Sequence, residues 1–269
     1  MSGSHNGPDD QGPDIENPGP DLGNFPNSAA TLKKGRAYIE MAPFSLSKAS
    51  RSGPAAYNWP FLLRYGVTDA LEFRLFGNGL TSNLGDNATT GFSPLAFDMK
   101  VHLWDDKVEI LRPAASLEVY IQTDWASSAF RGGTQPGLAL NFDLPLSKKL
   151  NLEWTIAYSG VQDVVDVATG QRFTPTLNNN DPLLLRENLN EYRFSFLWAV
   201  ERKVTEKLLL FVHGYYNGAI LYQQGSGDVI GGGFFRKCSK SVVVFGSCNA
   251  GLNQNVPPIS GLTGIALAF

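Results

Sequence analysis

From residue 34 onward, the chain alternates apolar and polar residues over most of its length. Residues 92–104 illustrate the pattern, since apolar and polar side chains occupy opposite parities there: Leu95, Phe97, Met99, Val101 and Leu103 against Asp98, Lys100 and His102. Successive side chains of a β-strand point to opposite faces of the sheet. A period of two therefore predicts strands with one apolar and one polar face.

A five-residue turn signature separates many of these stretches, at residues 67–71, 104–108, 146–150, 204–208 and 238–242. The other connections are much longer and rich in Gly, Asn, Ser and Pro. We predict twelve strands, at about residues 34–46, 57–67, 71–79, 92–104, 108–122, 135–145, 150–160, 190–201, 207–218, 229–238, 241–251 and 259–269. Short turns at one end and long loops at the other are typical of transmembrane β-barrels, and an even strand number places both termini on the periplasmic, short-turn side.

Strand length distinguishes a membrane barrel from a soluble β-sandwich, which would show the same alternation. Most expected strands have about 9–14 residues, enough for a tilted crossing of hydrocarbon, whereas strands of globular proteins average roughly 5–6. Trp and Tyr gather near the expected strand ends, as they do at membrane interfaces. We predict an all-β fold, a closed antiparallel transmembrane β-barrel with short periplasmic turns and long extracellular loops. A soluble β protein is the alternative.

Composition supports one large all-β domain in the 269 residues. Charged residues make up only 17% of the chain and the net charge is −3, which gives no electrostatic case for nucleic-acid binding. Residues 1–30 are rich in Asp, Gly, Pro and Asn, so we expect a disordered tail before a barrel over residues 31–269. That tail lacks a signal peptide although an outer-membrane barrel needs export, and we infer either a mature chain or a misassigned start.

The polar parity of the expected strands supplies the candidate binding residues. They are Arg64, Glu72, Arg74, Asp98, Lys100, His102, Arg112, Glu118, Glu153 and Arg193. In one interpretation these side chains line a polar pore that selects solutes by width and charge. In the other, they pair across strands and close a narrow interior. Twelve strands lie between filled eight-stranded barrels and open sixteen-stranded porins, so both interpretations stay open.

Catalysis and metal binding lack a recognisable constellation in this sequence. Neither His102 nor His213 has the neighbouring Ser and orienting group that a hydrolase needs, and no cluster has metal-ligand spacing. Cys238 and Cys248 fall too far apart along the chain to bridge across a hairpin, so we expect two free thiols. We predict no enzymatic activity, no metal and no cofactor. The loop over residues 161–189 either folds inward as a constriction or stays a disordered surface loop, and its three consecutive leucines favour docking because their exposure would be costly.

The run Trp59–Leu75 resembles the opening hairpin of a family of bacterial outer-membrane transporters, the MetA-pathway phenol-degradation family. Residues 34–40 resemble its first strand and residues 249–269 its last hairpin. The chain departs from the family at His213 and Phe245, where members often carry acidic residues.

This resemblance implies a bacterial outer-membrane barrel that passively admits small compounds, aromatic or hydrophobic ones among them. The alternative is a narrow barrel without flux that has a structural role or binds through its loops. The expected partners are outer-membrane lipid, a small-molecule solute and the barrel-assembly machinery, which would engage the last strand ending at Phe269.

Overall fold

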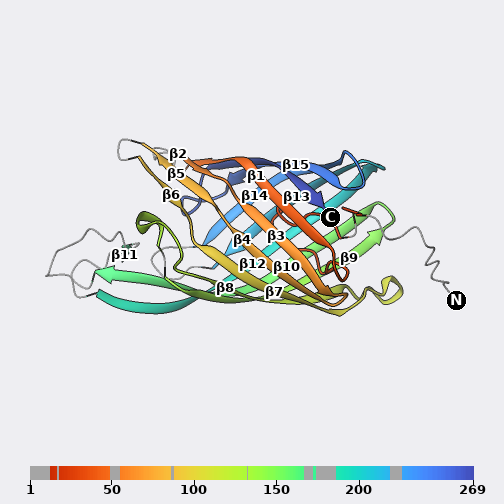
Figure 1. The fold of residues 1–269 in the computed structure, drawn as a ribbon, viewed down its shortest axis with the longest axis horizontal. Helices are drawn as coiled ribbons and strands as arrows, with labels where there is room; N and C mark the ends of the chain where they lie inside the picture. The colour runs from red at the N-terminus through yellow and green to blue at the C-terminus, as the bar shows by residue number, and fades with distance from the viewer. Residues whose placement is uncertain are drawn as a thin grey trace.

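The computed structural model describes residues 13–16, 18–48, 55–85, 88–131, 133–166, 172–173, 186–218 and 226–269. Its strands form a single antiparallel barrel (Figure 1). Twelve strands make the wall: β1 Ala37–Lys48, β3 Phe61–Thr68, β4 Leu71–Gly77, β7 Leu95–Trp104, β8 Ala114–Gln122, β9 Gln135–Ser147, β10 Leu150–Asp166, β12 Arg186–Thr205, β13 Leu208–Asn217, β14 Gly227–Lys237, β15 Val242–Gly251 and β16 Ile259–Ala268. The predicted fold class and strand number are confirmed.

Pairing between the first and last strands closes the barrel. β1 runs antiparallel to β16, with Tyr38 opposite Ala268 and Ser47 opposite Ser260. The Phe269 N–H also donates to the Ala37 carbonyl at 2.9 Å. Closure removes the two free edges of the sheet, which would otherwise leave backbone polar groups unpaired in hydrocarbon.

Three short strands extend the wall beyond the long-loop ends of β1, β4 and β7. β2 (Ala55–Asn58) pairs with β1 and with β5 (Leu80–Leu84), and β5 pairs with β6 (Thr89–Phe92). Pro60 and Pro94 lie at the breaks before β3 and β7, because proline has no N–H to donate to the ladder. The predicted long connection over residues 80–91 is therefore partly stranded.

The turn between β7 and β8 differs most from prediction. The expected strand over residues 108–122 begins only at Ala114, and a 3-10 helix, η1 (Val108–Ile110), precedes it. Leu111 has a φ of 52°, and Lys107 and Arg112 form an isolated bridge that closes the turn. Pro113 lacks the N–H that would continue the ladder, which explains why the strand starts after it.

The longest predicted loop, residues 161–189, is shorter than expected. β10 and β12 stay paired as far as Asp166 and Arg186, and β11 (Arg172–Phe173) pairs with β10. A second 3-10 helix, η2 (Ser128–Phe130), lies in the β8–β9 connection. The remainder of residues 161–189, with its three leucines, lies outside the described residues, as does the predicted constriction. Among the described residues, no helix is long and apolar enough to cross a membrane.

The two faces of the barrel wall are inverted relative to a soluble protein. Large apolar side chains are exposed on the outside, among them Tyr65, Phe73, Phe97, Val119 and Leu138. Charged side chains are buried on the inside, including Glu40, Glu72 and Lys100, each with no exposed surface. Because the apolar faces do not meet in a dry core, the soluble sandwich is excluded.

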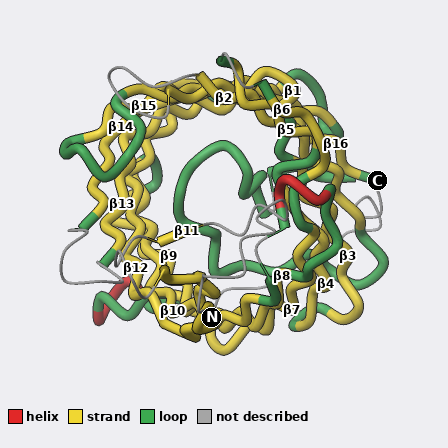
Figure 2. The backbone as a smooth tube through the Cα atoms, turned by 90° about the vertical axis from the view of Figure 1, so that its left-hand side faces the viewer, coloured by secondary structure: helices red, strands yellow, loops and turns green. Residues whose placement is uncertain are grey.

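The N-terminal segment, defined here by the described residues of 13–36, lies inside the barrel. Figure 2 shows it as a loop enclosed by the ring of strands. Ile15, Asp21, Ala29 and Leu32 are buried, so the expectation of a disordered tail over residues 1–30 does not hold for this part. The segment is ordered because inward-facing side chains of the wall hydrogen-bond to it.

Candidate functional site

Strand register assembles a buried network of charges inside the barrel. The cross-strand row Arg64–Arg74–Asp98 runs over β3, β4 and β7, and a parallel row, Glu72–Lys100–Glu118, runs over β4, β7 and β8. Residues of the same parity on paired strands share a face, so both rows point inward.

Ion pairs connect these rows to each other and to β1. The Arg64 Nε donates to Glu72 Oε1 at 2.7 Å, and the Arg64 Nη1 donates to Glu40 Oε1 at 3.2 Å. Arg74 pairs with Asp98 at 3.3 Å and with Glu118, which also lies 3.4 Å from Lys100 Nζ. Buried charges must be paired and hydrogen-bonded to be tolerated, and this network supplies the partners.

Asp21 of the N-terminal segment sits at the centre of the network. Its Oδ2 lies 3.0 Å from Lys100 Nζ and 3.5 Å from both Arg64 and Arg74. Burial raises the pKa of Asp21, but Arg64, Lys100 and Arg74 together outweigh burial and hold that pKa well below its usual range. Asp21 is therefore ionised at neutral pH and anchors the segment to three strands.

The amide and hydroxyl groups of Asn24 and Ser28 make further anchors. The Asn24 amide donates to Glu153 at 3.0 Å and to Glu201 at 3.1 Å. The Ser28 hydroxyl donates to Asp143 at 2.9 Å. The segment thus supplies neutral donors to these three carboxylates. Asn151 of the wall also donates to Glu153, at 3.1 Å, and Asp143 Oδ1 has no hydrogen-bond partner among the described residues.

Backbone N–H groups of the segment also bond to the wall. Leu22 donates to Glu40 at 2.8 Å, and Leu32 donates to Glu72 at 2.7 Å. The backbone N–H of Asn27 donates to the Thr155 hydroxyl at 3.2 Å, and its side-chain amide donates to Glu118 at 2.9 Å. Carboxylates of the wall thus accept hydrogen bonds from the segment.

An aromatic contact holds the segment on the opposite wall. Phe25 stacks on His213 of β13, with ring centroids 3.9 Å apart and an interplanar angle of 13°. His213 Nε2 lies 2.7 Å from the Asn249 side-chain oxygen. A Cβ at Gly231 would lie 2.0 Å from that oxygen, so only glycine leaves room for the Asn249 side chain there.

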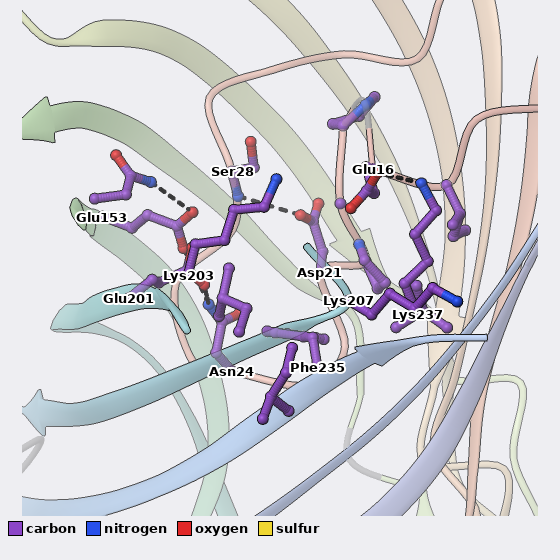
Figure 3. Close-up of a pocket in the computed structure, with 18 of the residues that line it drawn as sticks. Glu16, Asp21, Asn24, Ser28, Glu153, Glu201, Lys203, Lys207, Phe235 and Lys237 are labelled. Carbon is purple, nitrogen blue, oxygen red and sulfur yellow. Dashed lines mark hydrogen bonds and ion pairs between the residues drawn. The ribbon is translucent and has the colours of Figure 1, made fainter. Parts of the chain in front are cut away.

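The segment separates two cavities in the lumen. The outer cavity, at the long-loop ends of the strands, has a volume of about 640 Å³ and is lined by residues that include Asn78, Gln122 and Asn217. The inner cavity, at the short-turn ends, has a volume of about 420 Å³. Figure 3 shows Glu153 and Glu201 on one side of the inner cavity, with Lys203, Lys207 and Lys237 also lining it. Asp21 contributes to both cavities.

The structure places most of the candidate residues inside the barrel. Seven are buried: Arg64, Glu72, Arg74, Asp98, Lys100, Glu118 and Glu153. His102 lies near the β7–β8 turn, between the Ala29 carbonyl at 3.2 Å and Asp105 at 3.0 Å. Arg193 is half-buried on β12.

The placement of Arg112 was wrong. This residue was expected on the inward face of a strand, but it lies in the β7–β8 turn and donates to the Asp105 carbonyl at 2.9 Å. The cause is the late start of β8, which removes Arg112 from the strand and so from the alternation that predicted its direction.

The contribution of the N-terminal segment was missed in the sequence. Asp21, Asn24, Asn27 and Ser28 all contact the wall, and none belongs to an alternating stretch. One signal was available: Leu22, Phe25 and Leu32 punctuate the segment with apolar residues that a solvated tail does not need.

The chemistry of this lumen is that of binding and passage. In the described part of the chain, no group of three or more His, Cys, Asp or Glu side chains is arranged to hold a metal ion. The lumen offers hydrogen-bonding groups, aromatic faces and fixed charges, which are the elements that select solutes in pores.

A family model described as "Putative MetA-pathway of phenol degradation" matches residues 21–269. The chain belongs to this family. The resemblance seen in the Trp59–Leu75 hairpin is thereby confirmed, and the match includes part of the N-terminal segment. No curated protein matches the chain.

Solved structures of outer-membrane barrels resemble this member of the family. An outer-membrane channel from Pseudomonas putida F1 superimposes with a TM-score of 0.62 at 13% identity, covering 91% of this chain and 99% of that one. The NanC porin gives a TM-score of 0.55 at 9% identity, covering 86% and 98%. The KdgM porin gives 0.52 at 6% identity, covering 87% and 99%. At these identities the likeness shows the fold, which is that of outer-membrane barrels.

Proposed function

We propose that the protein is an outer-membrane channel that passively admits small compounds, aromatic and hydrophobic ones among them. In this proposal the N-terminal segment sets the width of the path. Membership in the phenol-degradation family and the outer-membrane barrel fold support the assignment. The family and the fold also support a location in a bacterial outer membrane, where lipid would surround the apolar exterior of the barrel.

The main observation behind this proposal is that the N-terminal segment divides the lumen into two cavities. Cavities of about 640 Å³ and 420 Å³ lie on opposite sides of a segment that is held only by non-covalent contacts and pairs with no strand along its buried part. A modest displacement of the segment would join the two spaces into one path. Small ligands bind in largely apolar sites with a few polar groups, and both cavities are of the usual size for such sites.

The lining of the outer cavity indicates which solutes fit. Phe25, Phe76, Tyr120 and Tyr215 present aromatic surface to it. Aromatic rings stack favourably on one another, with a gain of roughly 0.5–1.5 kcal/mol per pair beyond the area they bury. Small aromatic solutes are accordingly favoured over sugars of similar size.

Efflux from liposomes tests this function directly. The purified chain is reconstituted, and the release of benzyl alcohol is compared among the full chain, a chain lacking residues 1–30 and a matched control lacking residues 1–12. We expect flux through the full chain and faster flux after removal of residues 1–30. The control keeps every described contact of the segment, so a difference between the two deletions reports the loss of those contacts. Heat-dependent gel migration verifies that each barrel is folded.

Absence of flux in all three proteins would contradict the channel. That result would favour the narrow barrel without flux, for which the buried ion pairs would serve only to close the interior. Equal flux with and without residues 1–30 would show that the segment does not limit passage.

We further infer that the last strand carries the assembly signal. Phe269 is 59% exposed at the end of β16 and is hydrogen-bonded to Ala37 only through its backbone. Its ring is thus free to contact an assembly partner. Substitution Phe269→Ala should slow insertion in cells without changing the folded barrel, as measured by pulse-chase of heat-modifiable protein.

A further inference from the structure

The outer cavity has two chemically different sides, a feature that deepens the proposed function and rests on it. Its wall carries the aromatic and aliphatic residues, including Phe25, Phe76 and Leu197. Its floor carries charged residues that belong to the buried network: Asp21, Arg74, Asp98 and Glu118. A solute that fills this cavity meets apolar surface around its body and charge at one end.

Negative charge is in excess in that network. The ion pairs among the described residues connect five carboxylates to three cations: Asp21, Glu40, Glu72, Asp98 and Glu118 to Arg64, Arg74 and Lys100. With every group ionised, the formal charge of the network is −2. Fixed charge in a narrow, poorly solvated space attracts counter-ions and repels ions of like sign.

Asp98 is the least satisfied carboxylate on the floor. Its side chain is 2% exposed, and its single cationic partner among the described residues is Arg74, at 3.3 Å from Oδ2. Its Oδ1 has no hydrogen-bond partner among the described residues. A buried acceptor without a donor is costly, so a ligand that brings a donor to this carboxylate gains binding energy.

We propose that the outer cavity binds small aromatic amines, with the ring against the aromatic wall and the ammonium group at the Asp98 side of the floor. The ammonium supplies the donor and the positive charge that the network lacks. Its approach to aromatic faces adds a cation–π attraction. A carboxylate of the same size is repelled, and a neutral alcohol binds between these two.

Three compounds of similar size and different charge distinguish the contribution of charge to binding from that of shape. Benzylamine, benzyl alcohol and benzoate are titrated against the full chain in detergent by calorimetry, and their fluxes are measured in liposomes at pH 7.5. We expect benzylamine to bind about tenfold more tightly than benzyl alcohol, the lower end of the net contribution of one hydrogen bond to a charged group, and benzoate more weakly than both. The failure of benzyl alcohol to permeate would count against the proposed function, whereas the order of affinities tests only this inference.

A pair of isosteric variants locates the effect. Asp98→Asn should lower benzylamine affinity several-fold and benzyl alcohol affinity by less, because the alcohol brings a donor without a charge. The matched control Asp228→Asn removes a carboxylate that lies outside the cavity lining and bonds to Asn253; it should change neither affinity. Heat-dependent migration confirms folding of both.

Ion selectivity of the unsubstituted protein tests the inference without depending on the folding of any variant. In planar bilayers with a KCl gradient, the reversal potential should show preference for potassium over chloride, because the fixed charge acts on any ion in the lumen. Equal affinities for the three compounds, or a reversal potential that favours chloride, would overturn the inference.

Discussion

Replacing Asp21 by asparagine should release the N-terminal segment from the barrel wall. The change keeps the size of the side chain but removes the charge that pairs with Lys100 at 3.0 Å and with Arg64 and Arg74 at 3.5 Å. Asp21 is the segment's only acid in this network among the described residues. Its loss therefore weakens docking of the segment more than it weakens the barrel, whose strands remain paired.

The free-energy cost of Asp21→Asn follows from the burial of the ion pairs that Asp21 makes. Breaking a buried ion pair from one side costs about 3–5 kcal/mol. The lower end applies here, because Glu40 and Glu118 also neutralise the same cations. About 3 kcal/mol corresponds to roughly a hundredfold increase in the ratio of released to docked segment. Ser28→Ala removes the hydrogen bond to Asp143 and a bond within the segment, in which the Ser28 hydroxyl accepts from the Ala30 N–H. Only the first joins the segment to the wall, and its loss, at about 1 kcal/mol, should raise that ratio only about fivefold.

Single-channel recording measures this ratio as the fraction of time spent at high conductance. The fraction of time at high conductance should increase from the full chain to Ser28→Ala and again to Asp21→Asn. Deletion of residues 1–30 sets the conductance of the open barrel for comparison.

The pH dependence follows from the lowered pKa of Asp21. A carboxylate whose pKa is lowered on docking contributes stability above its ordinary pKa of about 3.9 and loses it only as the pH falls through the lowered value. The difference between the full chain and Asp21→Asn should thus persist from pH 8 down to pH 5 and vanish only in strong acid. An Asp21→Asn channel that opens no more often than the full chain would refute the assignment of Asp21 as the anchor.

Three further outcomes follow from other parts of the barrel. Val119→Arg, on the exposed face of β8, should destabilise the inserted barrel by about 2–4 kcal/mol in urea titrations in vesicles, and Val119→Leu should not; equal stability would contradict the outward direction of this residue. Gly66→Ala should cost about 1–3 kcal/mol in the same titration, because its Cβ would lie 2.2 Å from the Lys33 carbonyl, whereas Gly218→Ala, with its nearest contact at 3.4 Å, serves as the tolerant control. Cys238 and Cys248 are free and exposed, so unreduced, denatured protein should gain two maleimide adducts by mass; a mass that shows none would indicate a disulfide.

The alternation of residues determined the barrel wall because strand geometry is local. Inward and outward directions follow from parity alone, and this was enough to place Arg64, Arg74 and Lys100 inside the barrel. The direction of Arg112 was predicted wrongly because parity sets side-chain direction only within a strand. The chain turns through η1 and Leu111 before β8 begins, so Arg112 is not in a strand.

The occupation of the lumen was decided only by the tertiary structure. Residues 13–30 have the composition of a disordered tail, and nothing near them in the sequence orders them. Their partners on the wall lie far along the chain: Glu40 is 18 residues from Leu22, Glu201 is 177 residues from Asn24, and Lys237 is 221 residues from Glu16. Closure of twelve strands gathers these acceptors around one space, and only then does the segment bury enough hydrogen bonds and charge to offset the entropy of ordering it.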